Sequence, residues 1–160
     1  MKKKQIVILK GVNNMSVQSF LKSAEILYDN NKYEEALCLV CICIDACSTD
    51  KYPNKRNAER YKLFLKSHFS TICKYGFPGI EASNIRIKVN VPSIALKPDT
   101  NGYVDMEQII YHVLRCGLVH ECNIEKTIQF TDTTIVGDWG EKFYIPKDII
   151  WGLIEAIKEL

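Results

Sequence analysis

The chain has 160 residues, enough for one domain with a core of its own, so a second domain is not required. Hydrophobic residues make up 47% and charged residues 25%, a balance that excludes a disordered chain and is typical of a globular protein. The formal net charge is only +2, so the protein lacks the strongly positive overall charge that attracts nucleic acid. Any site for an anion would have to be local. We therefore expect one domain over residues 1–160, with a core over about 14–160 and an N-terminal extension over 1–13.

The apolar runs are too short for a secretion signal or a membrane span. Met1-Lys2-Lys3-Lys4 is followed by an apolar run over only Ile6 to Leu9, far shorter than the hydrophobic region of a signal peptide. The longest apolar run, Ala36 to Ile44, has about half the length that a bilayer crossing requires. We expect a cytoplasmic protein without a membrane segment, in which the seven cysteines are reduced thiols.

The first half of the chain predicts three helices. Apolar residues follow helical spacing over Ser16 to Tyr28, and the polar residues 29–31 then form a turn. The segment Tyr33 to Cys47 is apolar on nearly every side, which is typical of a helix at the centre of a bundle. Pro53 separates it from a third predicted helix over about Ala58 to Tyr75. Three helices with short links indicate an antiparallel bundle.

The second half mixes strand and helix patterns. Phe77-Pro78-Gly79 is a turn sequence, and alternation of apolar and polar residues over Ile85 to Val91 predicts a strand. After the Asn101-Gly102 turn, helical spacing predicts a fourth helix from about Asp105 to Val119.

The C-terminal part predicts a hairpin and a last helix. Residues 126–136 favour a strand, and Gly137-Asp138-Trp139-Gly140 can turn the chain back through Lys142 to Ile145. Pro146 suits the first position of a final helix over Lys147 to Glu159. The sequence thus predicts a mainly α fold, an antiparallel bundle of about five helices with a small β-strand or hairpin insertion.

An arginine and a histidine end the fourth predicted helix. Arg115 and His120 are five residues apart, a rotation of about 140° on an unbroken helix, so they would not share a face. Gly117 lies between them, and a glycine permits the last turn to unwind and bring both groups to one rim. A fixed guanidinium binds phosphate, and an imidazole transfers protons near neutral pH, so the pair suits RNA phosphodiester cleavage without a metal ion.

The segment Leu114-Arg115-Cys116-Gly117-Leu118-Val119-His120-Glu121 resembles the Arg-x4-6-His signature of HEPN domains. The order of predicted helices, including the third with Arg60-Tyr61-Lys62-Leu63-Phe64-Leu65, is similar to the bundle of that family. The resemblance covers most of the chain but is specific only at the motif. It implies a bundle that often forms a homodimer in which two motifs share a cleft. In active members it implies cleavage of RNA, with no metal or cofactor, in toxin–antitoxin, antiphage defence or RNA-processing systems.

Two positions depart from the HEPN pattern. Active members usually carry a polar residue directly after the arginine, where this chain has Cys116. One toxin branch has a tyrosine two residues after the histidine, where this chain has Cys122. The thiol at position 116 is a weaker hydrogen-bond donor than the residue it replaces, so the fold follows from the resemblance more firmly than catalysis does.

Other residues support either a catalytic or a structural interpretation of the motif. Asp45 is the only charge between Ala36 and Cys47, and a buried charge needs a partner, for which Arg115 is the natural candidate. Such a pair would either neutralise the arginine or hold it toward a phosphate; otherwise Asp45 lies at an exposed helix edge. Tyr111 would flank the cleft or pack in the core, and Glu121 closes the motif segment.

Further basic residues and cysteines have simple structural explanations as well. Arg60, with Arg56 and Lys62, would either extend an anion patch around Arg115 or form a solvated helix face. The second helix contains four cysteines: Cys38, Cys41, Cys43 and Cys47. They point in several directions around the helix and are expected in the core, so we predict no metal site there. His68 and His112 are expected to be structural or exposed.

Three functions remain open at this point. The first is a HEPN-like ribonuclease acting on RNA, with Arg115 as phosphate clamp, His120 as general acid or base, and a homodimer completing the cleft. The second is a non-catalytic HEPN-like module that binds a protein partner or a nucleotide. The third is a helical scaffold encoded beside a defence or antitoxin component, in which the motif has no role.

Overall fold

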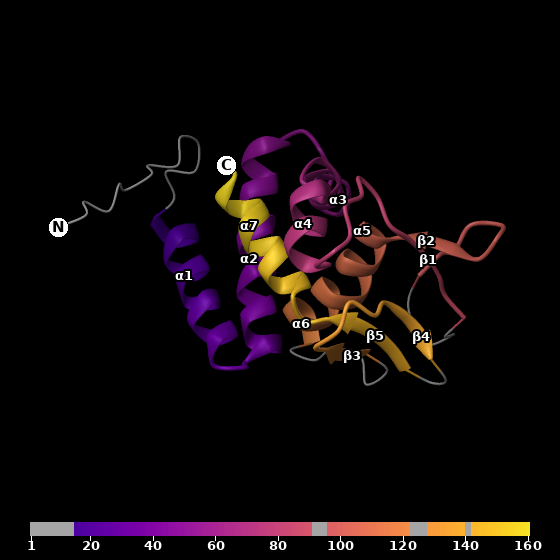
Figure 1. The fold of residues 1–160 in the computed structure, drawn as a ribbon. Helices are drawn as coiled ribbons and strands as arrows, with labels where there is room; N and C mark the ends of the chain where they lie inside the picture. Colours follow the sequence, from indigo (N-terminus) through magenta and orange to yellow (C-terminus); the bar gives the residue numbers. More distant parts are fainter. Residues whose placement is uncertain (1–14, 91–95, 122–127, 140–141) are drawn as a thin grey trace.

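Helices form most of the protein in the computed structural model (Figure 1). The structure describes residues 15–90, 96–121, 128–139 and 142–160, apart from the side chains of residues 120, 121, 138 and 139. The helices are α1 (Met15–Asp29), α2 (Tyr33–Lys51), α3 (Asn57–Ser67), α4 (Phe69–Gly76), α5 (Met106–Ile109), the π-helix η1 (Ile110–Arg115), α6 (Cys116–Glu121) and α7 (Ile149–Lys158). The strands are β1 (Arg86–Lys88), β2 (Tyr103–Asp105), β3 (Ile128–Thr131), β4 (Gly137–Trp139) and β5 (Lys142–Pro146). The predicted mainly α fold with a small β insertion is confirmed.

Helices α1 and α2 form an antiparallel hairpin, and α2 lies between α1 and the rest of the bundle (Figure 1). The predicted turn between them is confirmed: Asn31 has a φ of 60°, a left-handed conformation that asparagine tolerates better than most residues. Most of the apolar residues of α2 are buried, as its uniform pattern predicts: Ala36, Leu37, Val40, Cys41, Cys43, Ile44 and Cys47. The centre of the core therefore lies along α2.

The third predicted helix is divided in two at His68. This residue leaves helical geometry, with φ −112° and ψ 13°, and separates α3 from α4. Its imidazole lies between Lys51 Nζ at 3.0 Å and Glu159 Oε2 at 2.9 Å, so it links the end of α2 to the residue that follows α7. The prediction of a single helix from Ala58 to Tyr75 was therefore wrong at His68, whose side chain contacts residues from two other parts of the bundle.

Helices α4 and α7 pack closely because glycines stand at their crossing. A Cβ built on Gly152 would lie 2.5 Å from the carbonyl oxygen of Ile72 and 2.9 Å from the amide nitrogen of Gly76. A Cβ on Gly76 would lie 3.0 Å from the Cα of Ile149. The two backbones touch at this point, and no larger residue at position 152 fits there without a shift.

Two small sheets lie together at one end of the molecule, beyond α5 and α6 (Figure 1). Strands β1 and β2 pair antiparallel, with Ile87 opposite Val104. The expected strand over Ile85 to Val91 is confirmed for Arg86–Lys88, and Val91 lies outside the described residues. The turns before each of these strands contain Gly79 and Gly102, which have φ values of 89° and 83°.

The predicted hairpin has a different topology. Residues 137–139 form strand β4 instead of a turn, and β4 pairs antiparallel with β5. Strand β3 pairs with the other edge of β5 and runs parallel to it, with Ile128 opposite Phe143. Pro146 is the last residue of β5, opposite Thr131 of β3, and not the first residue of a helix. Helix α7 begins three residues later, at Ile149.

Within the described ranges, none of the helices combines the length and the apolar character that a membrane crossing needs.

Candidate functional site

The motif segment is one helical stretch with a wide turn in its middle. Helix α5 continues into the π-helix η1 and then into α6 without a break. A π-turn replaces the i→i+4 bond with an i→i+5 bond, and such turns often coincide with functional sites. Five of the six residues of η1 are buried, and His112 is the half-buried exception. The wide turn sends Arg115 toward α2 and His112 toward the β1–β2 sheet.

Arg115 lies in the core, where Asp45 of α2 binds it. Its Nε and one terminal nitrogen donate to the same carboxylate oxygen, at 3.1 Å and 2.7 Å. Arg115 is 5% exposed, and the side chain of Asp45 is 21% exposed. The ion pair that the sequence predicted between these residues is therefore present, and Asp45 does not lie at an exposed helix edge.

Asn57, the first residue of α3, completes this arrangement. With its amide nitrogen toward Asp45 Oδ1 and its oxygen toward Arg115, both separations are 3.2 Å, and this orientation satisfies both groups. Asn57 was not among the predicted site residues. The available signal was an amide at the start of a predicted helix, which indicates a cap and not a partner for a distant arginine.

Two tyrosine rings enclose the guanidinium. The central carbon of Arg115 lies 5.4 Å from the ring centre of Tyr111 and 6.0 Å from that of Tyr61, within range for cation–π attraction. The rings meet edge to face at 5.3 Å. Burial raises the pKa of the Tyr61 hydroxyl well above its ordinary value, and the neighbouring Cys41 thiol adds to the rise. Tyr111 is 7% exposed and packs in the core, one of its two expected positions.

The surroundings of Arg115 keep its buried guanidinium protonated. Burial by itself lowers its pKa, but hydrogen bonding and attraction from Asp45 outweigh burial, so the pKa is raised. Contact with the half-buried Cys116 contributes in the same direction. The guanidinium is thus held by protein groups and neutralised by a carboxylate. In this arrangement it joins neighbouring helices and is not presented to an external phosphate.

Beyond Arg115 the motif continues as helix α6. Gly117 lies inside α6, which is regular α-helix over Cys116–Glu121, so the expected unwinding at this glycine does not occur. Positions 115 and 120 are therefore separated by about 140° around the helix. The side chains of His120 and Glu121, like Cys122, lie outside the described part of the structure.

Arg60 does not join the Arg115 pair. It is half-buried on α3, and its Nε is buried without a hydrogen-bond partner among the described residues. Its neighbour Lys62 faces a different space, the pocket described next, where its ammonium lies 3.3 Å from Gln108 Oε1. Of the three residues expected in an anion patch around Arg115, Lys62 therefore lines a different space.

A polar pocket of about 470 Å³ lies between α3, η1 and the β1–β2 sheet. His112 forms one wall, and its pKa is lowered, first by burial and then by repulsion from the Lys62 and Lys97 ammoniums. His112 was expected to be structural or exposed. Its place beside two lysines was not predictable, because Lys97 belongs to a connection whose course depends on the β1–β2 pairing. The pocket is lined by Lys62, Arg86, Lys97, Asp99, Tyr103, Val104, Asp105, Gln108 and His112.

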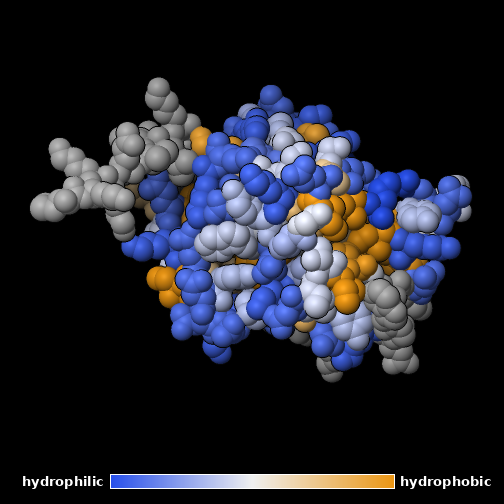
Figure 2. All heavy atoms as spheres, in the orientation of Figure 1, coloured by the Kyte–Doolittle hydropathy of each residue, from blue (hydrophilic) through white to orange (hydrophobic). Residues whose placement is uncertain are grey.

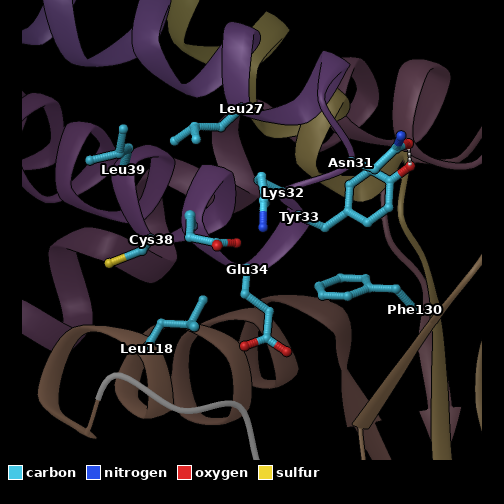
Figure 3. A pocket seen from close by; sticks show the side chains of 10 residues that line it. Leu27, Asn31, Lys32, Tyr33, Glu34, Cys38, Leu39, Leu118 and Phe130 are labelled. Carbon is cyan, nitrogen blue, oxygen red and sulfur yellow. Dashed lines mark hydrogen bonds between the residues drawn. The ribbon is translucent and has the colours of Figure 1, made fainter.

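A second, mostly apolar groove of about 760 Å³ lies between the α1–α2 turn and α6 (Figure 3). Leu27, Leu39 and Leu118 surround it, and Phe130 of β3 lies near Tyr33. The Tyr33 hydroxyl donates to Asn31 Oδ1 at 2.6 Å, which fixes the ring at the rim. On the face shown in Figure 2, another apolar patch lies toward the small sheets, where Phe77, Ile80, Ile85 and Val136 line a shallower groove.

The cysteines of α2 are core residues, as predicted. Cys41, Cys43 and Cys47 are buried and Cys38 is half-buried, and none of the four forms a disulfide with another described residue. Burial raises the pKa of Cys41 and of Cys43 to about 12, and that of Cys47 to about 11. In the described ranges, no three His, Cys, Asp or Glu side chains are placed to hold a metal ion.

Comparison with family models gives a match to the family described as Rv1289 over residues 16–157. The chain belongs to the Rv1289 family. The match runs from the first turn of α1 nearly to the end of α7, so the Arg115 pair and the polar pocket both lie inside the region that defines this Rv1289-family domain. Curated proteins and solved structures give no match to the chain.

Proposed function

We propose that this Rv1289-family chain is a HEPN-like binding module without ribonuclease activity. The observation that carries the proposal is the burial of Arg115, which is 5% exposed and bound by Asp45 through two nitrogens. A phosphate clamp in RNA cleavage has to reach the phosphoryl oxygens of a polymer from a water-accessible cleft. Here the guanidinium is paired with the carboxylate of Asp45, which neutralises its charge inside the protein.

The path of α6 supports the same proposal. Regular α-helix over Cys116–Glu121 places positions 115 and 120 on different sides of the helix, so a single copy does not offer both to one phosphate. Cys116 replaces the polar residue that active HEPN domains usually carry after the arginine. The motif then has a structural function, fastening η1 to α2 and α3.

A metal-independent endoribonuclease is the second candidate. One observation favours it: a π-turn ends at Arg115, and π-turns recur at functional sites. In this version a homodimer brings His120 of one copy to Arg115 of the other, which requires Arg115 to leave Asp45. The cytoplasmic location, the homodimer and a role as an accessory protein in a toxin–antitoxin or antiphage system belong to the proposal in either version.

Cleavage of a mixed RNA pool in EDTA tests the proposal. The wild-type protein should leave the RNA intact at protein concentrations where a metal-independent ribonuclease, run in parallel, degrades it. Cleavage by the wild type that is lost in Arg115→Lys and in His120→Ala, and kept in Arg56→Ala, would overturn the proposal in favour of the nuclease. Arg56 is an exposed arginine next to α3, so this variant controls for the loss of one surface charge. Circular dichroism of each variant shows that it is folded.

The oligomeric state is measured separately by sedimentation equilibrium. A homodimer agrees with the proposed HEPN-like assembly. A monomer at all concentrations would overturn the homodimer and, with it, the composite nuclease cleft, but would leave the binding module.

A further inference from the structure

The pocket beside η1 gathers basic side chains from three separate segments. Lys62 comes from α3, His112 from η1, and Lys97 from the connection that leads to β2. Repulsion from both ammoniums acts on the imidazole, which places all three groups around one space. Like charges brought together in a pocket raise the electrostatic energy of the folded protein unless an anion joins them.

The carboxylates of the pocket do not neutralise these lysines. Asp99 and Asp105 both bind Arg86, with nitrogen–oxygen distances of 2.5 Å and 3.1 Å. Asp99 also accepts the backbone N–H groups of Asn101 and Tyr103, both at 2.9 Å. In the part of the chain that the structure describes, Lys97 Nζ makes no hydrogen bond or ion pair, and Lys62 Nζ reaches only an amide oxygen and an aromatic ring.

The other wall of the pocket suits hydroxyl groups. Asp105 Oδ1 accepts from Arg86 Nε and from Asn84, and a carboxylate has a second oxygen with which to accept from a ligand. Gln108 adds an amide, and the exposed ring of Tyr103 lies under the Arg86 guanidinium at 5.8 Å. A cationic end and a hydrogen-bonding end therefore share a volume in the range of small-molecule sites.

We propose that this pocket binds a small hydroxylated phosphomonoester, a sugar phosphate, with the phosphate against Lys62, Lys97 and His112 and the hydroxyl groups toward Asp105 and Gln108. This inference rests on the proposed function, since it names the ligand class of the binding module. It places the ligand beside His112 in a pocket that Arg115 does not line, so the two polar centres of η1 have separate roles.

Isothermal titration calorimetry with ribose 5-phosphate, inorganic phosphate and ribose tests the ligand class. Ribose 5-phosphate should bind, inorganic phosphate should bind more weakly because it lacks the hydroxyl contacts, and ribose should give no heat. Lys97→Ala should weaken binding of ribose 5-phosphate about tenfold, since a charge-assisted hydrogen bond is lost. Lys66→Ala removes the same charge from an exposed position one turn from Lys62 and should leave binding unchanged.

Two results would overturn the inference. One is the absence of binding by ribose 5-phosphate and by inorganic phosphate. The other is equal weakening by Lys97→Ala and Lys66→Ala, which would indicate attraction to overall charge and not a site. Equal binding of inorganic phosphate and ribose 5-phosphate would overturn the sugar part and retain a plain phosphate site.

The pH dependence of sulfate binding provides a second readout, because sulfate does not titrate in the neutral range. Between pH 8 and about pH 5.5, binding should strengthen as pH falls, since His112 gains a proton when an anion is present. The titratable and charged groups that face His112 are Lys62, Arg86, Lys97, Asp99, Asp105 and Tyr111. His112→Asn should bind sulfate with little pH dependence; a slope equal to that of the wild type would remove His112 from the site.

These measurements separate the inference from the proposed function. Intact RNA together with no binding of the three probes would leave a non-catalytic module with another ligand. RNA cleavage that depends on Arg115 would overturn the proposed function even if ribose 5-phosphate binds.

Discussion

At the scale of single residues, the buried guanidinium of Arg115 is held by four neighbouring side chains. Asp45 and Asn57 bind its polar atoms, and Tyr61 and Tyr111 cover its faces. Removing one partner of such a pair leaves an uncompensated charge in the core. Replacing both partners with apolar residues of similar size costs much less.

A double-mutant cycle tests this directly. Arg115→Met alone should lower the free energy of unfolding by about 3 kcal/mol, because Asp45 stays partly buried without its cation. Asp45→Leu together with Arg115→Met should cost less than the sum of the two single changes. Urea denaturation measures all four proteins. Simple additivity would show that the two side chains do not interact in solution.

The thiols of α2 lead to a prediction about reactivity. Burial raises the pKa of Cys41 and Cys43 to about 12, so neither forms much thiolate near neutral pH. Iodoacetamide at about pH 8, followed by mass spectrometry, should label half-buried Cys116 faster than these two in the native protein. All cysteines should react after denaturation. Rapid native labelling of Cys41 would contradict its position in the core.

The residue-level predictions from sequence succeeded where a charge stood out from its surroundings. Asp45 interrupts an apolar run, so its need for a cation could be inferred, and Arg115 was the right partner. Asn57 and Lys97 gave no such signal, because an amide near a helix start and a lysine in a connection are both ordinary. Their positions depend on how α3 and the β1–β2 sheet pack against η1, which local patterns do not specify.

At the scale of elements, the crossing of α4 and α7 depends on the absence of a side chain. Gly152 lets the backbone of α7 reach the last turn of α4. An added methyl group would meet a carbonyl oxygen and an amide nitrogen, both of them backbone atoms that cannot rotate away.

Gly152→Ala should therefore destabilise the protein by about 3 kcal/mol, despite the better helix propensity of alanine. Thermal denaturation followed by circular dichroism measures the effect. Ser70→Ala, an exposed change on α4, serves as the control and should shift the midpoint little. A neutral or stabilising Gly152→Ala would show that the two helices are farther apart than described.

The helices were largely predictable and the strand topology was not. Apolar spacing indicated α1, α2 and α7 to within a few residues, because each has a continuous face against the core. The π-turn was not predictable, since Met106, Ile109, Ile110, Val113 and Leu114 also fit an α-helix. The parallel pairing of β3 with β5 depends on contacts across the chain, and the glycine of Gly137–Trp139 gave the false signal of a turn.

At the scale of the whole molecule, polar contacts join the N-terminal hairpin to the C-terminal segment, among them the ion pair of Glu25 with Lys158 and a hydrogen bond from Tyr28. The Tyr28 hydroxyl donates to Asp148 Oδ1 at 2.6 Å, just before α7 begins. Burial, followed by the hydrogen bond to Asp148, raises the pKa of Tyr28 above its ordinary value. The folded protein therefore keeps this proton at a pH where the unfolded chain releases it.

This linkage predicts a loss of stability at alkaline pH. Above about pH 10 the folded state binds more protons than the unfolded state at Tyr28, so stability falls as pH rises. Tyr28→Phe should cost about 1 kcal/mol near pH 8 and progressively less toward pH 11. Tyr75→Phe, at an exposed tyrosine, is the control. A pH-independent difference between wild type and Tyr28→Phe would exclude a raised pKa.

The π-turn has a consequence for the history of the family. A wide turn holds one residue more than an α-turn, so a relative without it should show a one-residue gap in an alignment between the positions of Ile109 and Cys116. Without the extra residue, the side chains before and after the turn change their relative orientation. With the same helix packing, such a relative could keep either the pair of Arg115 and Asp45 or the position of His112 beside the lysines, but not both. The gap would then divide the Rv1289 family into lineages, and co-inheritance of the extra residue with Lys62, Lys97 and His112 would mark those that retain the pocket.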